Sequence, residues 1–134
     1  MSVQPPLAFW RDQGPMIFWA VALFVQSSIP SSELPEWSIL THDKVIHFLI
    51  YVVFTYTVHR ALTRQDRFLS MRRRAYLASI LLIAFYAAID EWHQYFVPGR
   101  DCSLLDWIAD CVGACVFVIA HWAYSKLRAI APAK

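Results

Sequence analysis

Four apolar segments, each close to the length needed to cross a lipid bilayer, make up most of this chain of 134 residues. A helix needs about 20 predominantly apolar residues to cross the hydrocarbon core. By this criterion we predict membrane-spanning helices at residues 14–29, 44–62, 74–96 and 103–127, of which the first is the shortest. Helices satisfy their backbone hydrogen bonds internally in lipid, and long apolar runs with only three glycines do not resemble the alternating strands of a barrel. The sequence therefore predicts an all-α membrane protein, with a single domain over residues 1–134 that folds as a four-helix bundle.

Composition and charge agree with this class and suggest an orientation. The chain is 58% hydrophobic with a mean hydropathy of +0.41, outside the usual range of soluble domains, and its formal net charge is only +2. The two connections 30–43 and 97–103 contain a single basic residue, Arg100. The connection between the second and third predicted helices is instead rich in arginine: Arg60, Arg64, Arg67, Arg72, Arg73 and Arg74. The positive-inside rule therefore places this connection and both termini in the cytoplasm. Topology and anionic lipid headgroups explain the arginines, so we predict a bilayer partner and no nucleic-acid partner.

Polar side chains enter the predicted helices mainly at their extracytoplasmic ends. An ionisable group inside a membrane helix costs roughly 2.5–3.5 kcal/mol and usually marks a functional site. Ten polar residues are the candidate ligand-binding set: Asp43, Lys44, His47, Asp90, Glu91, Gln94, Arg100, Ser103, Asp106 and Asp110. They come from three predicted helices and one turn, while Gln26, Ser27 and Ser28 close the first helix at the same end. We therefore expect one polar pocket in the outer half of the bundle.

Helical spacing supports this convergence. Asp106, Asp110 and Gly113 follow a 3-4-3 pattern after Ser103, which puts them on one face of a helix. Asp90 precedes the turn by as many residues as Asp110 follows it, so both carboxylates should lie about 10 Å from the turn. Gly113 would allow a neighbouring helix to approach just below the last carboxylate. Glu91 points about 100° away from Asp90, so we expect only one of that pair to face the pocket squarely.

The chemistry of the pocket leaves several alternatives open. Carboxylates close together in a low dielectric cannot all ionise, so one must be protonated or paired with Arg100, Lys44, a protonated His47, a metal ion or a cationic ligand group. Arg100 either clamps Asp101, Asp106 or Asp90, or recognises a ligand phosphate or carboxylate. His47 is a general base, a metal ligand or a hydrogen-bond partner of Asp43 or Asp90. Ser103 has the position of a helix N-cap, with Asp106 at the capping-box position. No spacing here is diagnostic of metal ligands, so we assign none and identify no cofactor.

Three motifs, in this order, resemble those of the VanZ-like family of small bacterial membrane proteins. They are Asp43-Lys44-Val45-Ile46-His47-Phe48, then Asp90-Glu91-Trp92-His93-Gln94, then Pro98-Gly99-Arg100-Asp101-Cys102-Ser103 with Asp106. The resemblance covers Ser27 to about Val118, and it implies a multi-pass protein of the bacterial cytoplasmic membrane. The name-giving member is associated with teicoplanin resistance, and the family supplies no established reaction. Many relatives carry Asn where this chain has Asp110.

Three functions are compatible with these residues. The first, which we favour, is a cell-envelope protein that binds a lipid-linked or peptidoglycan-related ligand, or a glycopeptide, at the outer leaflet. The second is a membrane-embedded hydrolase or transferase in which His47 and Asp90 act as acid and base. The third is a small transporter or proton relay, although only His59 and His121 interrupt the apolar inner halves. Without a nucleophile motif such as G-x-S-x-G, the sequence leaves open whether the protein is an enzyme.

Overall fold

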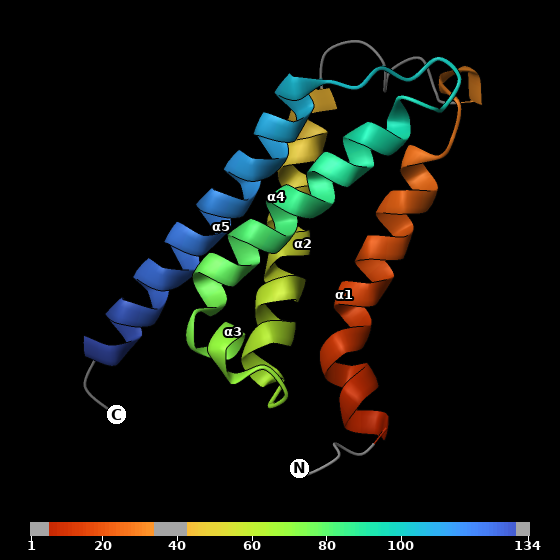
Figure 1. Cartoon of the computed structure of the whole chain (residues 1–134). Coiled ribbons are helices and arrows are strands. Elements are labelled where there is room, and N and C mark those ends of the chain that lie inside the picture. The colour runs from red at the N-terminus through yellow and green to blue at the C-terminus, as the bar shows by residue number, and fades with distance from the viewer. Residues whose placement is uncertain (1–5, 34–42, 131–134) are drawn as a thin grey trace.

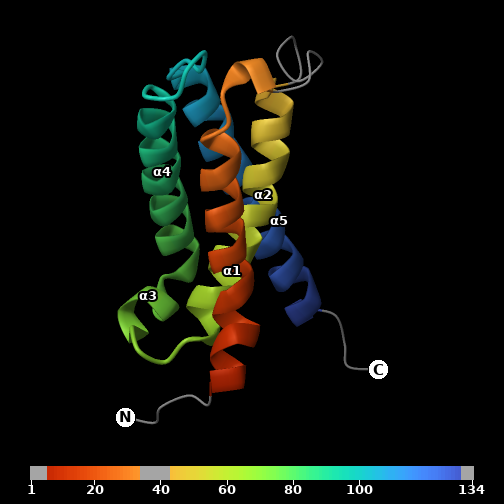
Figure 2. The same ribbon diagram turned by 90° about the vertical axis from the view of Figure 1, so that its right-hand side faces the viewer.

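The structure, a computed structural model, describes the backbone of residues 6–33 and 43–130. Side chains are described for residues 8–33 and 44–130. Its helices are α1 (Pro6–Ser27), the 3-10 turn η1 (Ser31–Glu33), α2 (Asp43–Arg64), α3 (Leu69–Arg73), α4 (Ala75–Gln94) and α5 (Leu104–Ile130). No strand occurs in the described stretches, which confirms the all-α prediction. The four long helices run lengthwise beside one another, and the start of α1 and the end of α5 lie at the same end as α3 (Figures 1 and 2).

Three of the four predicted spans match helices that can cross a membrane. The segments of α2, α4 and α5 between Lys44 and Arg64, Ala75 and Gln94, and Leu104 and Ile130 are long and apolar enough to do so by length and composition. Their bounds differ from the predicted ones by a few residues at each end. The prediction of four spans is thus supported for three helices, because α1 is not among those that meet this criterion.

Helix α1 begins earlier than the sequence suggested. We expected the helix to start beside Pro15, but Pro15 lies inside a 22-residue helix that begins at Pro6. A proline within a helix leaves the carbonyl four residues before it without its usual partner. Here that carbonyl belongs to Arg11, and Arg60 Nη1 of α2 donates to it at 2.8 Å. Gln13 Nε2 adds a hydrogen bond to the Ala61 carbonyl at 3.1 Å, so contacts with α2 stabilise the first turns of α1.

Helix α2 is the centre of the bundle and packs against α1, α4 and α5. Its buried side chains Tyr51, Phe54 and Val58 meet Ile83 of α4 and Ala114 of α5 in the hydrophobic core. A Cβ atom at Gly113 would lie only 2.6 Å from the Phe48 carbonyl oxygen. The backbones of α2 and α5 are therefore in direct contact at this point, which confirms the close approach predicted for Gly113.

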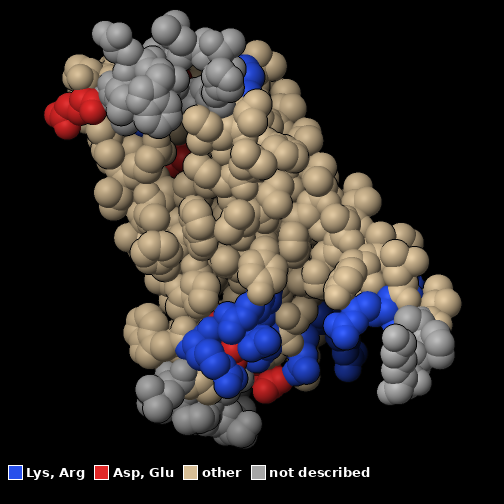
Figure 3. All heavy atoms as spheres, turned by 180° about the vertical axis from the view of Figure 1, so that it is seen from behind, with Lys and Arg blue, Asp and Glu red and all other residues tan. Residues whose placement is uncertain are grey.

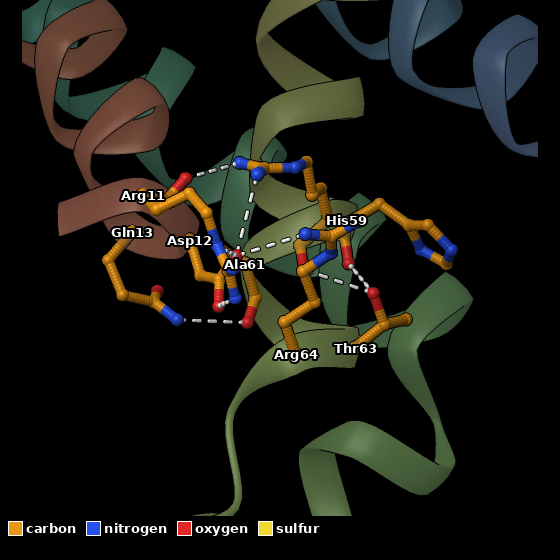
Figure 4. A network of polar contacts seen from close by, with 8 residues as sticks. Arg11, Asp12, Gln13, His59, Ala61, Thr63 and Arg64 are labelled. Atoms are coloured by element: carbon orange, nitrogen blue, oxygen red, sulfur yellow. Dashed lines mark hydrogen bonds and ion pairs between the residues drawn. The ribbon is translucent and has the colours of Figure 1, made fainter. Parts of the chain in front are cut away.

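The two ends of the bundle differ in charge. Figure 3 shows most of the Lys and Arg side chains gathered at one end of the face in view, below a wide band without charge. At that end Asp12 is 4% exposed and forms ion pairs with Arg11 at 3.1 Å, Arg64 at 3.0 Å and Arg60 at 3.4 Å. Figure 4 shows this group between the first turns of α1 and the last turns of α2. The guanidinium of Arg11, followed by that of Arg64, lowers the pKa of Asp12 to about 2.

Outside the core, the long helices expose large apolar side chains. Phe18 of α1, Phe85 of α4 and Leu127 of α5 are each about two thirds exposed, with fractions of 68%, 67% and 68%. Extensive exposed apolar surface marks contact with a membrane or a partner. Together with the length and composition of α2, α4 and α5, this surface identifies a membrane protein.

Candidate functional site

The end of the bundle opposite the arginines contains a buried polar cluster. We define the polar cluster as Ser27, Lys44, His47, Asp90, Glu91, Asp106 and Asp110. Its four acids are between 1% and 8% exposed, although charged residues are almost never buried to this degree without partners. The members come from all four long helices, because each helix places a polar turn at this depth. The convergence expected from the sequence is therefore present for these residues.

Two polar pairs join α2 to α5. Lys44 Nζ lies 2.8 Å from Asp106 Oδ1, and His47 Nδ1 lies 3.1 Å from Asp110 Oδ1. Lys44 and His47 are three positions apart, and Asp106 and Asp110 are four apart, so each pair of residues shares one helix face. The two contacts consequently form successive rungs between the same helices, directly above the close approach at Gly113.

Helix α4 contributes two adjacent acids that face different neighbours. Asp90 Oδ1 accepts a hydrogen bond from Ser27 Oγ of α1 at 2.7 Å. Glu91 Oε2 accepts one from the Ser103 backbone N–H at 2.7 Å. We expected only one of these acids to face the pocket, but both are buried because α4 lies between α1 on one side and the start of α5 on the other. Asp90 and Asp110 both lie beside His47, which contacts Asp110 and lines a small cavity together with Asp90.

Ser103 is the N-cap of α5, as its position indicated. Its Oγ accepts a hydrogen bond from the Asp106 N–H at 3.3 Å. The second half of a capping box would be a bond from the Ser103 N–H to the Asp106 side chain. Instead, Glu91 of α4 takes that N–H, and Asp106 pairs with Lys44. The capping of α5 therefore also connects it to α4.

Arg100 takes a position that differs from both interpretations drawn from the sequence. Its Nε and Nη2 atoms donate to the carbonyls of Ile29 and Gln26, each at 3.2 Å. Gln26 lies in the last turn of α1 and Ile29 lies just after the helix, so Arg100 ties the end of α1 to the turn between α4 and α5. The turn before it is held against η1, since the Ser31 N–H donates to the Pro98 carbonyl at 3.3 Å. Arg100 thus fixes the end of α1 beside the polar cluster and does not pair with its carboxylates.

The remaining candidates lie at the edge of the cluster or outside the described side chains. Gln94 is 5% exposed and interacts with the Asp90 carboxylate. His93, the neighbour of Gln94 on α4, contacts Ser28 Oγ at 2.9 Å and stacks on Phe24. Asp43 is the first residue of α2, and its side chain is not among those described.

Tyr51 is a member of the site that was not among the candidates drawn from the sequence. Its side chain is 1% exposed, and its hydroxyl has no hydrogen-bond partner among the described residues. The ring is parallel to that of His47, with an interplanar angle of 6° and 6.5 Å between centroids. The signal in the sequence was its place on the helix face that carries His47, but a tyrosine in an apolar helix is usually part of the core.

A small cavity lies beside this ring. It has a volume of about 30 Å³ and is lined by Leu23, Gln26, Ile46, His47, Ile50, Tyr51 and Asp90. This volume is enough for one water molecule or one ion. Close by, donor atoms of His47, Glu91 and Asp110 all lie within 4.8 Å of one another, a spacing suited to a metal ion. The arrangement can therefore hold a small polar group, a cation, or a proton shared between acids.

A second histidine group lies in the other half of the bundle. The rings of His59 and His121 are 4.9 Å apart, and Tyr76 Oη lies 3.0 Å from His121 Nδ1. Along α2, His59 is separated from His47 by about 18 Å at 1.5 Å per residue. Buried apolar side chains such as Phe54 and Ile83 occupy the core between them.

Comparison with known proteins identifies a family for this chain. A family model described as VanZ/LLP1 matches residues 10–125. No curated protein and no solved structure matches the chain. The matched range includes all seven residues of the polar cluster and nearly all of the four long helices.

Proposed function

This chain belongs to the VanZ/LLP1 family, and from that membership we propose that it binds a cell-envelope ligand at the extracytoplasmic end of its bundle. The ligand is a lipid-linked or peptidoglycan-related molecule, or a glycopeptide of the teicoplanin type. The protein is then a multi-pass component of the bacterial cytoplasmic membrane and a relative of teicoplanin-resistance proteins. The observation that carries the proposal is the polar cluster, in which four acids from two helices are buried and two of them pair with Lys44 and His47.

The proposed orientation follows from charge. We take α1 as a fourth crossing beside the three helices that meet the length and hydropathy criterion. Four crossings would put both termini on the same side of the membrane as the arginine-rich connection around α3. Because basic residues remain in the cytoplasm, the polar cluster faces the outer leaflet. A ligand that arrives from the cell wall, or remains anchored in the outer leaflet, meets the cluster from that side.

A membrane-embedded hydrolase or transferase is the second candidate. The observation that favours it is the contact between His47 Nδ1 and Asp110, since a carboxylate that orients an imidazole is a common arrangement for a general base. In this alternative His47 and Asp90 carry the acid–base chemistry beside the small cavity. Binding without turnover would support the first candidate, and release of a product would support the second.

The test uses the whole protein in lipid nanodiscs. Teicoplanin and a polyprenyl-pyrophosphate-linked cell-wall precursor are titrated separately against wild type, Asp90→Asn and Asp110→Asn. We expect both variants to lose ligand binding. They should keep the helical circular dichroism of wild type, because an amide is easier to bury than a carboxylate. Asp66→Asn, an exposed acid at the opposite end, is the matched control and should bind as wild type. Unchanged binding in both cluster variants, or no binding of either ligand by wild type, would contradict the proposal.

A further inference from the structure

We propose that His47, Glu91 and Asp110 form a binding site for a divalent transition-metal cation. The three residues come from α2, α4 and α5, and one donor atom of each lies within 4.8 Å of the other two. Zinc binds imidazole nitrogen and carboxylate oxygen at about 2.0–2.2 Å, so donor atoms around one ion lie about 3–4 Å apart. The widest spacing of the three atoms, up to 4.8 Å, would have to close by about 1 Å when the ion binds. A short contact between His47 and Asp110 already exists at 3.1 Å.

The balance of charge at this depth favours a cation. Asp90, Glu91 and Asp110 are 6%, 5% and 1% exposed, and a buried carboxylate is unfavourable unless it is paired or coordinates a metal. Within the described residues, the hydrogen bonds given to Asp90 by Ser27 and to Glu91 by Ser103 come from uncharged donors. Neither Asp90 nor Glu91 forms an ion pair with another described residue. Lys44 pairs with Asp106. A divalent ion between Glu91 and Asp110 compensates two of these carboxylates at once.

Tyr51 gives an independent indication that a non-protein group belongs here. Its hydroxyl is buried without a partner in the described structure, beside the ring of His47 and the cavity of about 30 Å³. Tyr51, His47 and Asp90 line this cavity together, and His47 in turn contacts Asp110. An unsatisfied buried hydroxyl is rare and needs an explanation such as a water or an ion. A water molecule bound to the cation would offer it an acceptor.

The ligand types identify the class of metal. One imidazole and two carboxylates suit Zn²⁺ or Mn²⁺, whereas Ca²⁺ and Mg²⁺ prefer ligands that are all oxygen. Glu91 is already oriented by the Ser103 N–H through Oε2, which leaves Oε1 for an ion. Supporting hydrogen bonds of this kind fix metal ligands in place. Three protein ligands would leave a further coordination position for water or for a ligand oxygen.

The metal site does not depend on the ligand proposed above, although a bound cation would neutralise much of the negative charge that an anionic ligand meets. The test is made on full-length protein in detergent, stripped with EDTA and dialysed back against Zn²⁺ or Mn²⁺. We expect one equivalent of metal per chain by elemental analysis, and an increase in the unfolding temperature on Zn²⁺ addition. Substitution with Co²⁺ should give visible absorption bands that report coordination directly.

Variants distinguish this site from adventitious binding. Glu91→Gln and Asp110→Asn should each weaken metal affinity at least about tenfold and abolish the thermal shift. Asp66→Asn is the control and should behave as wild type. If the carboxylate variants fail to fold, Tyr51→Phe is the second probe, because it removes only an unpartnered hydroxyl. It should fold, bind metal more weakly, and shift the Co²⁺ bands.

The opposing results are equally specific. Absence of saturable binding to wild type, or the same stoichiometry and affinity in wild type and Asp110→Asn, overturns the metal site. Binding of the cell-envelope ligand by a protein that takes up no metal on dialysis against Zn²⁺ or Mn²⁺ removes the metal site and leaves the proposed function intact. Metal binding in the absence of any ligand binding supports the metal site and removes the proposed function.

Discussion

Gly113 lies where the close packing of α2 against α5 leaves no room for a larger side chain. A methyl group there would lie 2.6 Å from the Phe48 carbonyl oxygen and 3.3 Å from the Val52 nitrogen, both backbone atoms that cannot rotate away. Gly113→Ala should therefore separate α2 from α5 and lower the free energy of unfolding by about 1–3 kcal/mol. Thermal unfolding in detergent measures this loss.

Gly14 provides the matched control for that substitution. An added Cβ at Gly14 would have an ordinary contact, 3.8 Å from Trp10 Cε3. Alanine is a better helix former than glycine by about 0.5–1 kcal/mol, so Gly14→Ala should leave stability unchanged or raise it. Equal stability of Gly113→Ala and wild type would show that the two helices can separate without cost.

Asp12 should make folding sensitive to acid in a defined range of pH. Arg11 and Arg64 lower its pKa in the folded protein from the ordinary value of 3.8 to about 2. Because the folded state favours the charged form, this stabilisation is complete above about pH 4 and is lost as the pH falls through about 2. The difference in unfolding temperature between wild type and Asp12→Asn should therefore be constant from about pH 7 to about 5 and shrink between about pH 4 and 2.

The exposed Asp66 tests whether this effect is specific. Its side chain is 58% exposed and pairs with Arg72, which is itself 47% exposed. Exposed ion pairs contribute little to stability, so Asp66→Asn should unfold like wild type throughout the titration. A difference for Asp12→Asn that is as large in strong acid as at neutral pH would mean that its charge is not the cause.

Among the elements, α1 is bound to its neighbours by polar contacts at both of its ends. Asp12 and the carbonyl of Arg11 bind α2 at one end, and Arg100 binds the carbonyls of Gln26 and Ile29 at the other. Arg100→Ala removes two hydrogen bonds and should destabilise the last turn of α1 by about 1 kcal/mol. Hydrogen exchange should rise for residues 24–29 and remain unchanged in α4 and α5.

Arg100→Lys refines that measurement. A single ammonium group cannot reproduce the planar fork that reaches two carbonyls, so recovery should be partial. Arg67→Ala, in the exposed connection before α3, is the control and should leave exchange in α1 unchanged. Exchange that stays at the wild-type level in Arg100→Ala would mean that these hydrogen bonds do not hold α1.

Helices were predictable to the extent that their determinants are local. The apolar runs of α2, α4 and α5 predicted those elements because membrane-length hydrophobicity is a property of each segment alone. The start of α1 was missed because its first turns depend on Arg60 and Ala61 of another helix. Helix α3, Leu69–Arg73, is too short and too basic to leave a periodic apolar signal.

The site was predictable in depth and less so in its pairings. Counting residues from the turn placed Asp90 and Asp110 at one level, because the rise per residue of a helix is fixed. Which atoms meet depends on how each helix is rotated about its axis. That rotation decides that Glu91 caps α5 and that Arg100 binds α1. Neither contact could be predicted from the spacing of residues within one helix.

For the whole molecule, the orientation in the membrane is open to a direct test that uses a natural cysteine. Cys102 is exposed in the turn between α4 and α5, while Ser70 lies in α3 at the opposite end. In intact cells a membrane-impermeant maleimide should modify Cys102. In a Cys102→Ser background, the thiol introduced by Ser70→Cys should react only after the membrane is permeabilised. Modification of that engineered position in intact cells would reverse the proposed topology.

The contribution of every long helix to one buried cluster has a consequence for biogenesis. During translation α4 emerges before α5, so Glu91 and Asp90 enter the bilayer before the Ser103 N–H and the α5 residues around them exist. A chain interrupted just after α4 retains Lys44 and His47 but lacks the two aspartates that they contact. Polar side chains that lose such buried contacts oppose stable insertion in lipid. The cluster thus makes durable residence in the membrane conditional on completion of the last helix, and a truncated product should be cleared by membrane proteases before it accumulates.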